Sequence, residues 1–186
     1  AGALGGSAFA QNSIQGLLGL GSAVTELKSG TYVMTDANGL AYGFTSVSED
    51  GVLQEGILDY KATSIADDKK DDVKQYIWKV TVTENLGAYS YKFENVATGK
   101  TLRVNTTAGS EAVELNSAAS GNVIKDVFAF GATQIGTTGK YTASEKALFA
   151  YNGNKSDVFQ LKWSAGGSLI STTASSFDLS FYAVES

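Results

Sequence analysis

The sequence predicts an all-β domain assembled from three related units, and three observations support this prediction. The 186 residues include 21 glycines, nine tyrosines and nine phenylalanines, a composition typical of short strands joined by many turns. From Ser29 onward, apolar and polar residues alternate instead of following a helical period. Similar apolar stretches then return at nearly constant spacing along the chain.

The composition excludes several classes of function. The chain has no cysteine and no histidine, which removes thiol chemistry, a serine–histidine pair and the usual zinc ligands. It also lacks a G-x-S-x-G elbow, a G-x-G-x-x-G loop and a P-loop. We therefore predict a protein that is not an enzyme, binds no metal and needs no cofactor.

The charge and the apolar runs limit the partners. The 19 acidic residues outnumber the 14 basic ones, and a net charge of −5 repels a phosphate backbone. No apolar run reaches the roughly 18 residues of a membrane-spanning helix. We expect neither a nucleic-acid partner nor a membrane span.

Residues 1–28 form an apolar segment rich in glycine and alanine, which we separate from a domain at residues 29–186. Ala8-Phe9-Ala10 has the A-x-A form that precedes a signal-peptidase cleavage site. This pattern predicts the remnant of an export signal, and therefore a secreted or cell-surface protein. The alternative is a simple glycine- and alanine-rich terminus.

The end of this segment predicts a helix, with Asn12 or Ser13 as its N-cap. Its glycines weaken the helix by about 1 kcal/mol each, so the helix needs a packing partner. That partner is either the chain's own domain or a neighbouring subunit, which would allow self-association. The apolar stripe comprises Ile14, Leu17, Leu18, Gly21, Val24 and Leu27. In the second case the docking residues are Ile14, Leu17, Leu18, Val24 and Leu27.

Three units follow, beginning with a strand at Gly30-Thr31-Tyr32. The segments that end the units place Trp78, Ala129 and Leu179 at equivalent positions, 51 and 50 residues apart. Glycine–tyrosine pairs also recur, and they match Tyr32, Tyr89 and Tyr141. Units of about fifty residues cannot bury their apolar faces separately, but three of them can close around one core.

The middle unit is the most regular. The stretch Trp78-Lys79-Val80 followed by YKFENVATGKTL, residues 91–102, resembles the rhythm W-x-V, then Y-x-F-x-N-x-x-T-G-K-x-L, of ricin-type lectin-like β-trefoils. The chain is also similar to trefoil-like domains of secreted proteins from gut Bacteroidetes. The resemblance covers residues 30–186 and implies a β-trefoil, a bacterial origin and a carbohydrate-binding scaffold.

The sugar-binding signature of that family is broken in this chain. Gln75 precedes Trp78 by three positions instead of two, and the other units carry Ala129 and Leu179 in place of tryptophan. Weaker ligand-binding candidates combine a hydrogen-bonding group with an aromatic ring, as sugar sites do. These are Asp36, Asn38 and Tyr42 in the first unit, and Tyr151 and Asn152 in the third. The alternative for them is ordinary turn chemistry.

The residues of the chain are consistent with two functions. The first is a non-catalytic extracellular binding module that contacts a glycan or a protein partner through its loops. The second is a structural subunit of a surface assembly or filament, which docks onto the next copy through its N-terminal apolar segment.

Overall fold

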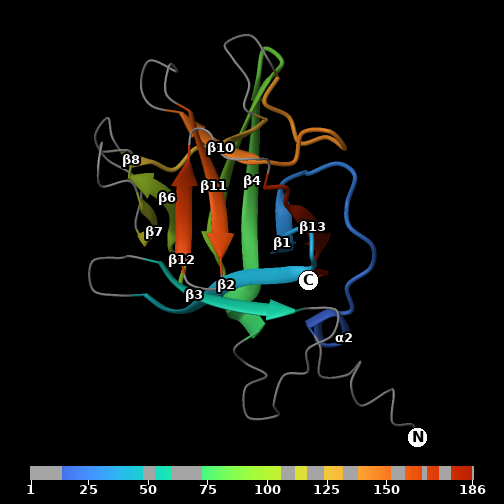
Figure 1. The fold of residues 1–186 in the computed structure, drawn as a ribbon. Coiled ribbons are helices and arrows are strands. Elements are labelled where there is room, and N and C mark those ends of the chain that lie inside the picture. The colour runs from blue at the N-terminus through green and yellow to red at the C-terminus, as the bar shows by residue number, and fades with distance from the viewer. Residues whose placement is uncertain are drawn as a thin grey trace, which may run out of the picture.

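The computed structural model describes residues 14–47, 53–59, 73–105, 112–116, 124–131, 138–151, 158–164, 167–171 and 177–185. These residues are mostly in β-strands, so the all-β prediction is confirmed (Figure 1). The elements are α2 (Ile14–Leu18), β1 (Gly30–Thr35), β2 (Leu40–Val47), β3 (Leu53–Asp59), β4 (Ile77–Asn85), β5 (Ala88–Asn95), β6 (Thr101–Asn105), β7 (Ala112–Asn116), β8 (Ile124–Lys125), β9 (Ala129–Phe130), β10 (Leu148–Tyr151), β11 (Val158–Ser164), β12 (Gly167–Ser171) and β13 (Ser180–Ala183).

The described strands form two sheets. The first has the order β3-β2-β1-β4-β5-β6-β7, with β13 paired to β1 and β8 paired to β6. The second has the order β12-β11-β10-β9. Tyr91 and Phe128 join the two sheets, because the backbone N–H of each donates a hydrogen bond of 2.9 Å to the carbonyl oxygen of the other. Strands from both sheets therefore share one interior.

Aromatic side chains fill this interior. Phe130 contacts Tyr141 edge to face, with ring centroids 5.0 Å apart and planes inclined by 79°. Phe181 lies at the centre of several such contacts and is 5.4 Å from the Tyr141 ring. Edge-to-face pairs stabilise a core by about 0.5–1.5 kcal/mol beyond the burial of their area. The largest fully buried rings are those of Trp78, Tyr91, Phe93, Phe128, Phe130, Tyr141 and Phe181.

The structure changes one of the three positions that the repeat alignment matched. Trp78 and Leu179 are buried in the core, whereas Ala129 is only half-buried. Its neighbour Phe128 is fully buried. Because alternate residues of a strand face opposite sides, Phe128 and not Ala129 points into the core, as Trp78 does. Two residues further along from Trp78, Phe128 and Leu179, the residues Val80, Phe130 and Phe181 are also buried.

The tyrosine positions need a similar correction in the middle unit. Tyr89 is half-buried, and the ammonium group of Lys140 lies 5.2 Å from its ring centroid. Tyr91 is buried, as Tyr32 and Tyr141 are, and its backbone pairs with a buried residue as that of Tyr32 does. The contacts are Tyr32 opposite Trp78, Tyr91 opposite Phe128, and the Tyr141 hydroxyl donating to the Leu179 carbonyl oxygen at 3.0 Å.

The N-terminal helix is much shorter than the apolar stripe. Helix α2 has five residues and ends at Leu18. Gly19 follows with φ 62°, the left-handed conformation that ends helices and that glycine adopts without steric cost. The chain from Gly19 to Ser29 then has no helix or strand, so the residues of the stripe reach their neighbours from an irregular segment.

Candidate functional site

A polar depression of about 100 Å³ lies on the exposed face of the sheet formed by β4, β5 and β6. Strand register brings its residues together, since Lys79 lies opposite Glu94 and Thr81 lies opposite Lys92. Thr101 of β6 lies on the other side of Glu94. Alternation along β4 and β5 places these polar residues outward and sends the residues between them into the core.

The charges around the depression are balanced. The Lys92 ammonium lies 3.7 Å from the carboxylate Oδ2 of Asp126, and the Lys92 side chain is half exposed. Lys79 faces the carboxylate-bearing Glu94 across the strand pair. Two lysines and one glutamate line the depression, and Asp126 forms an ion pair with one of these lysines, so neither sign of charge dominates the site.

The floor of the depression is rigid. Phe93 lines it from below and is itself fully buried. Its ring is inclined by only 20° to that of Phe181, at 6.2 Å between centroids, and it also packs against Phe128 at 5.8 Å. A close-packed floor fixes the backbone that carries Lys92 and Glu94, and rigid elements position binding groups better than loops do.

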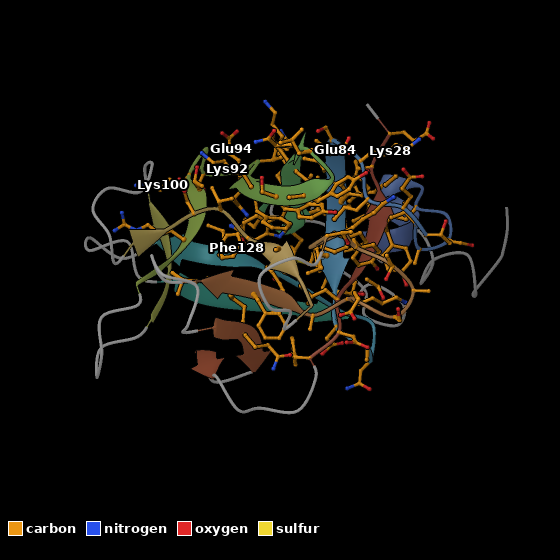
Figure 2. The ribbon with its side chains drawn as sticks, turned by 90° about the horizontal axis from the view of Figure 1, so that it is seen from above. Lys28, Glu84, Lys92, Glu94, Lys100 and Phe128 are labelled. Carbon is orange, nitrogen blue, oxygen red and sulfur yellow. The ribbon has the colours of Figure 1, made fainter. Side chains whose placement is uncertain are left out.

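The turn between β5 and β6 fixes the position of β6, the strand that carries Thr101. The buried Asn95 side chain donates a hydrogen bond of 2.9 Å to the Gln75 carbonyl oxygen and accepts one of 3.2 Å from the Thr98 backbone N–H. Gly99 adopts φ 69°, which this turn requires. Figure 2 shows Lys100, which follows this turn, on the same side of the molecule as Lys92 and Glu94.

The depression offers both donors and acceptors. Each lysine ammonium has three donors, each threonine hydroxyl can donate and accept, and the Glu94 carboxylate accepts only. The volume suits one small polar group, because drug-sized pockets begin at roughly 300 Å³. The arrangement can therefore hold one ring or branch of a larger ligand whose hydroxyl groups donate and accept together.

Asp36 and Asn38, two of the three ligand-binding candidates of the first unit, lie in a turn. The Asp36 carboxylate Oδ1 accepts a hydrogen bond of 2.8 Å from the Asn38 backbone N–H, and the Asp36 carbonyl oxygen accepts one of 3.1 Å from Gly39. Asp36 is buried and Asn38 is exposed. These hydrogen bonds are ordinary turn chemistry, which was the alternative to ligand binding for these residues. The side chains of Tyr42 and Tyr151, and all of Asn152, lie outside the described residues.

The five predicted docking residues contact their own chain. Ile14 is fully buried in an apolar cluster that includes Val33, Tyr76 and Tyr182. Leu17 and Leu18 pack against the same cluster, whereas Val24 and Leu27 pack with the main core. These contacts correspond to the alternative in which the segment covers its own domain. Docking onto another copy through Ile14 or Leu27 would require the segment to leave these positions first.

Sequence reasoning missed the residues of the depression. Lys79, Thr81, Lys92 and Glu94 alternate with apolar residues in KVTV and YKFE, a pattern that is typical of strands with one exposed face. The pattern does not say which exposed residues of different strands meet. Only the strand register supplies that information.

The described residues contain no group of three or more acidic side chains that could hold a metal ion. No helix among them is long and apolar enough to span a membrane. No protein-family model matches the sequence, and no curated protein matches it.

Proposed function

We propose that the chain is a non-catalytic, extracellular binding module on a β-trefoil scaffold, and that the depression on β4, β5 and β6 contacts a glycan. The proposal has two parts. The scaffold part depends on the pairing of the strands, and the ligand part depends on the chemistry of the depression.

The pairing of strands around the core supports the β-trefoil. Going around the interior, β13 pairs with β1, β1 with β4, and β4 with β5. Tyr91 of β5 then bridges to Phe128, and the Phe130 N–H bonds to the Gly139 carbonyl oxygen. The Leu179 N–H bonds to the Lys146 carbonyl oxygen and brings the path back towards β13. A path that returns to its first strand is what a closed barrel requires.

A second set of strands supports the same scaffold. Strands β2 and β3, β6 and β7, and β11 and β12 form three antiparallel pairs. The second strands of these pairs, β3, β7 and β12, lie against one another. Three hairpins that meet in this way, one from each unit, match the cap of a β-trefoil.

The balanced mixture of donors and acceptors in the depression is the observation that carries the glycan part. A phosphate or carboxylate ligand would gain from Lys79 but would meet the Glu94 carboxylate beside it. A cationic ligand would meet both lysines. A neutral polyol satisfies both signs at once, because each hydroxyl donates one hydrogen bond and accepts others.

The experiment is a glycan array probed with the wild-type chain and with Lys79→Ala and Glu94→Gln. Matched controls are Lys28→Ala and Glu185→Gln, since both residues are exposed and neither lines the depression. Figure 2 shows Lys28 on the other side of the view from Lys92 and Glu94. We expect the two site variants to lose at least tenfold in affinity for any glycan that binds, and the controls to bind as the wild type does. Silence of the wild-type chain across the array would remove the glycan part.

A further inference from the structure

Leu86 stands at the tip of the β4–β5 hairpin with its side chain fully exposed. Asn85 pairs with Ala88, so Leu86 and Gly87 form a two-residue turn with φ values of 53° and 84°. Such a turn requires positive φ at both positions, and the usual residues are asparagine or aspartate followed by glycine. Leu86 is the only non-glycine residue with positive φ in the described part of the chain.

This leucine contributes nothing to folding that a polar residue would not contribute better. A leucine with left-handed backbone geometry costs about 1–2 kcal/mol, and no burial offsets this cost. Asparagine adopts the same φ at lower cost and would also be better solvated. A strained, fully exposed apolar residue at the end of a hairpin is therefore a candidate for a binding contact.

The hairpin holds Leu86 in a fixed position. The Ser29 hydroxyl accepts a hydrogen bond of 2.9 Å from the Val82 N–H, where β4 extends beyond its pairing with β1. On the other strand, the Tyr89 N–H donates one of 2.8 Å to the Thr138 carbonyl oxygen. Figure 1 shows the hairpin of β4 rising to the upper end of the molecule. A residue whose backbone is already held in place loses little conformational freedom on binding.

We propose that Leu86 is the anchor of a second binding surface, which takes a protein partner through an apolar socket with a cationic rim. We infer the cationic rim from the negative charge of Glu84, which lies close to Leu86 in the chain. Glu84 lies two residues from Leu86, is exposed, and forms no ion pair with a described residue.

A second copy of the chain fits less well, because a symmetric contact between two tips would bring the two Glu84 carboxylates together. A lipid surface fits less well still, because one leucine buries too little area to hold a chain of net charge −5 on a membrane.

The test selects a displayed library of random disulfide-constrained peptides on the wild-type chain, with removal of peptides that also bind Leu86→Asn. We expect surviving peptides that combine an apolar residue with lysine or arginine. Their affinity should fall at least tenfold for Leu86→Asn and severalfold for Glu84→Gln, and should weaken with salt. Val96→Asn, which changes another exposed apolar residue, should bind them as the wild type does.

Three results would overturn the proposal. The first is a selection that yields no peptide able to distinguish the wild type from Leu86→Asn. The second is peptides that are lost on Lys79→Ala instead, which would place them in the depression. The third is a Leu86-dependent dimer in sedimentation, or Leu86-dependent binding to phosphatidylcholine vesicles.

Leu86→Asn should melt at or above the temperature of the wild type, so that its loss of binding is not a loss of folding. Glycan binding should stay unchanged in Leu86→Asn, which separates this proposal from the one above.

Discussion

The hydroxyl oxygen of Tyr91 accepts a hydrogen bond of 3.0 Å from the backbone N–H of Tyr141, which lies 50 residues further along the chain. Both residues are buried in the core. The Tyr141 hydroxyl in turn donates to the Leu179 carbonyl oxygen at 3.0 Å. Two tyrosines thus join β5 to the segment that holds Tyr141, and this segment to Leu179, which directly precedes β13.

Tyr91→Phe should destabilise the chain by about 1–3 kcal/mol, because the buried Tyr141 N–H then has no acceptor. The measurement is unfolding in urea, followed by fluorescence. Tyr89→Phe is the matched control, since the Tyr89 ring is only half-buried and its hydroxyl bonds to no described residue. Equal losses in the two variants would mean that the hydrogen bond contributes nothing to stability.

The stability should fall in alkaline solution. Burial raises the pKa of Tyr141 to about 12, and the charges of Asp178 and Tyr182 add to this shift. Burial also raises the pKa of Tyr91. A raised folded-state pKa favours the protonated form, so this stability is complete below about pH 10 and is lost as the pH rises towards 12, by up to about 3 kcal/mol for Tyr141.

Unfolding in urea at several pH values, together with tyrosinate absorbance, tests this pH dependence. Tyr141→Phe should be less stable than the wild type at neutral pH but should lose less stability between about pH 10 and 12. An unchanged pH profile in this variant would show that Tyr141 does not titrate late.

Two glycines with positive φ should respond differently to alanine. A Cβ at Gly139 would lie 3.0 Å from the Ala129 Cβ and 3.0 Å from the Tyr89 carbonyl oxygen, whereas a Cβ at Gly87 would meet nothing within 4 Å. Gly87→Ala should therefore cost about 1–2 kcal/mol from backbone strain alone. Gly139→Ala should cost clearly more, as measured by thermal unfolding. Equal costs would contradict the close contact at Gly139.

Ile14→Ala distinguishes the two roles of the N-terminal segment. Ile14 is fully buried within the chain, so its truncation should cost about 2–5 kcal/mol in urea unfolding. Leu18→Ala, at a half-buried position of the same helix, should cost less. If Ile14 served only to dock onto another copy, its truncation would leave the monomer's stability unchanged and would alter only the sedimentation of the protein.

The sequence indicated which stretches form strands, but it did not indicate as well which residues of a strand face the core. In VFAF, residues 127–130, apolar residues occupy both faces of the strand, so the alternation could not separate Phe128 from Ala129. The structure does so by exposing Val127 and burying Phe128. The helix was predicted too long because the stripe continues through Gly19, where the backbone turns left-handed.

The candidate site was beyond the reach of sequence reasoning for a different reason. Lys79 and Glu94 are 15 residues apart in the chain, and they meet only because of the register of a hairpin. The strain at Leu86 was also hidden, although the turn residues Leu86-Gly87 are unusual for a tight hairpin and could have drawn attention to it.

The most direct test of the glycan-binding proposal is an amide chemical-shift titration of the isotope-labelled chain with a glycan that the array identifies. We expect the shifts to concentrate at Thr81, Lys92, Glu94 and Thr101, and to disappear in Lys79→Ala. Shifts confined to other parts of the chain, or shifts that persist unchanged in Lys79→Ala, would contradict the proposal.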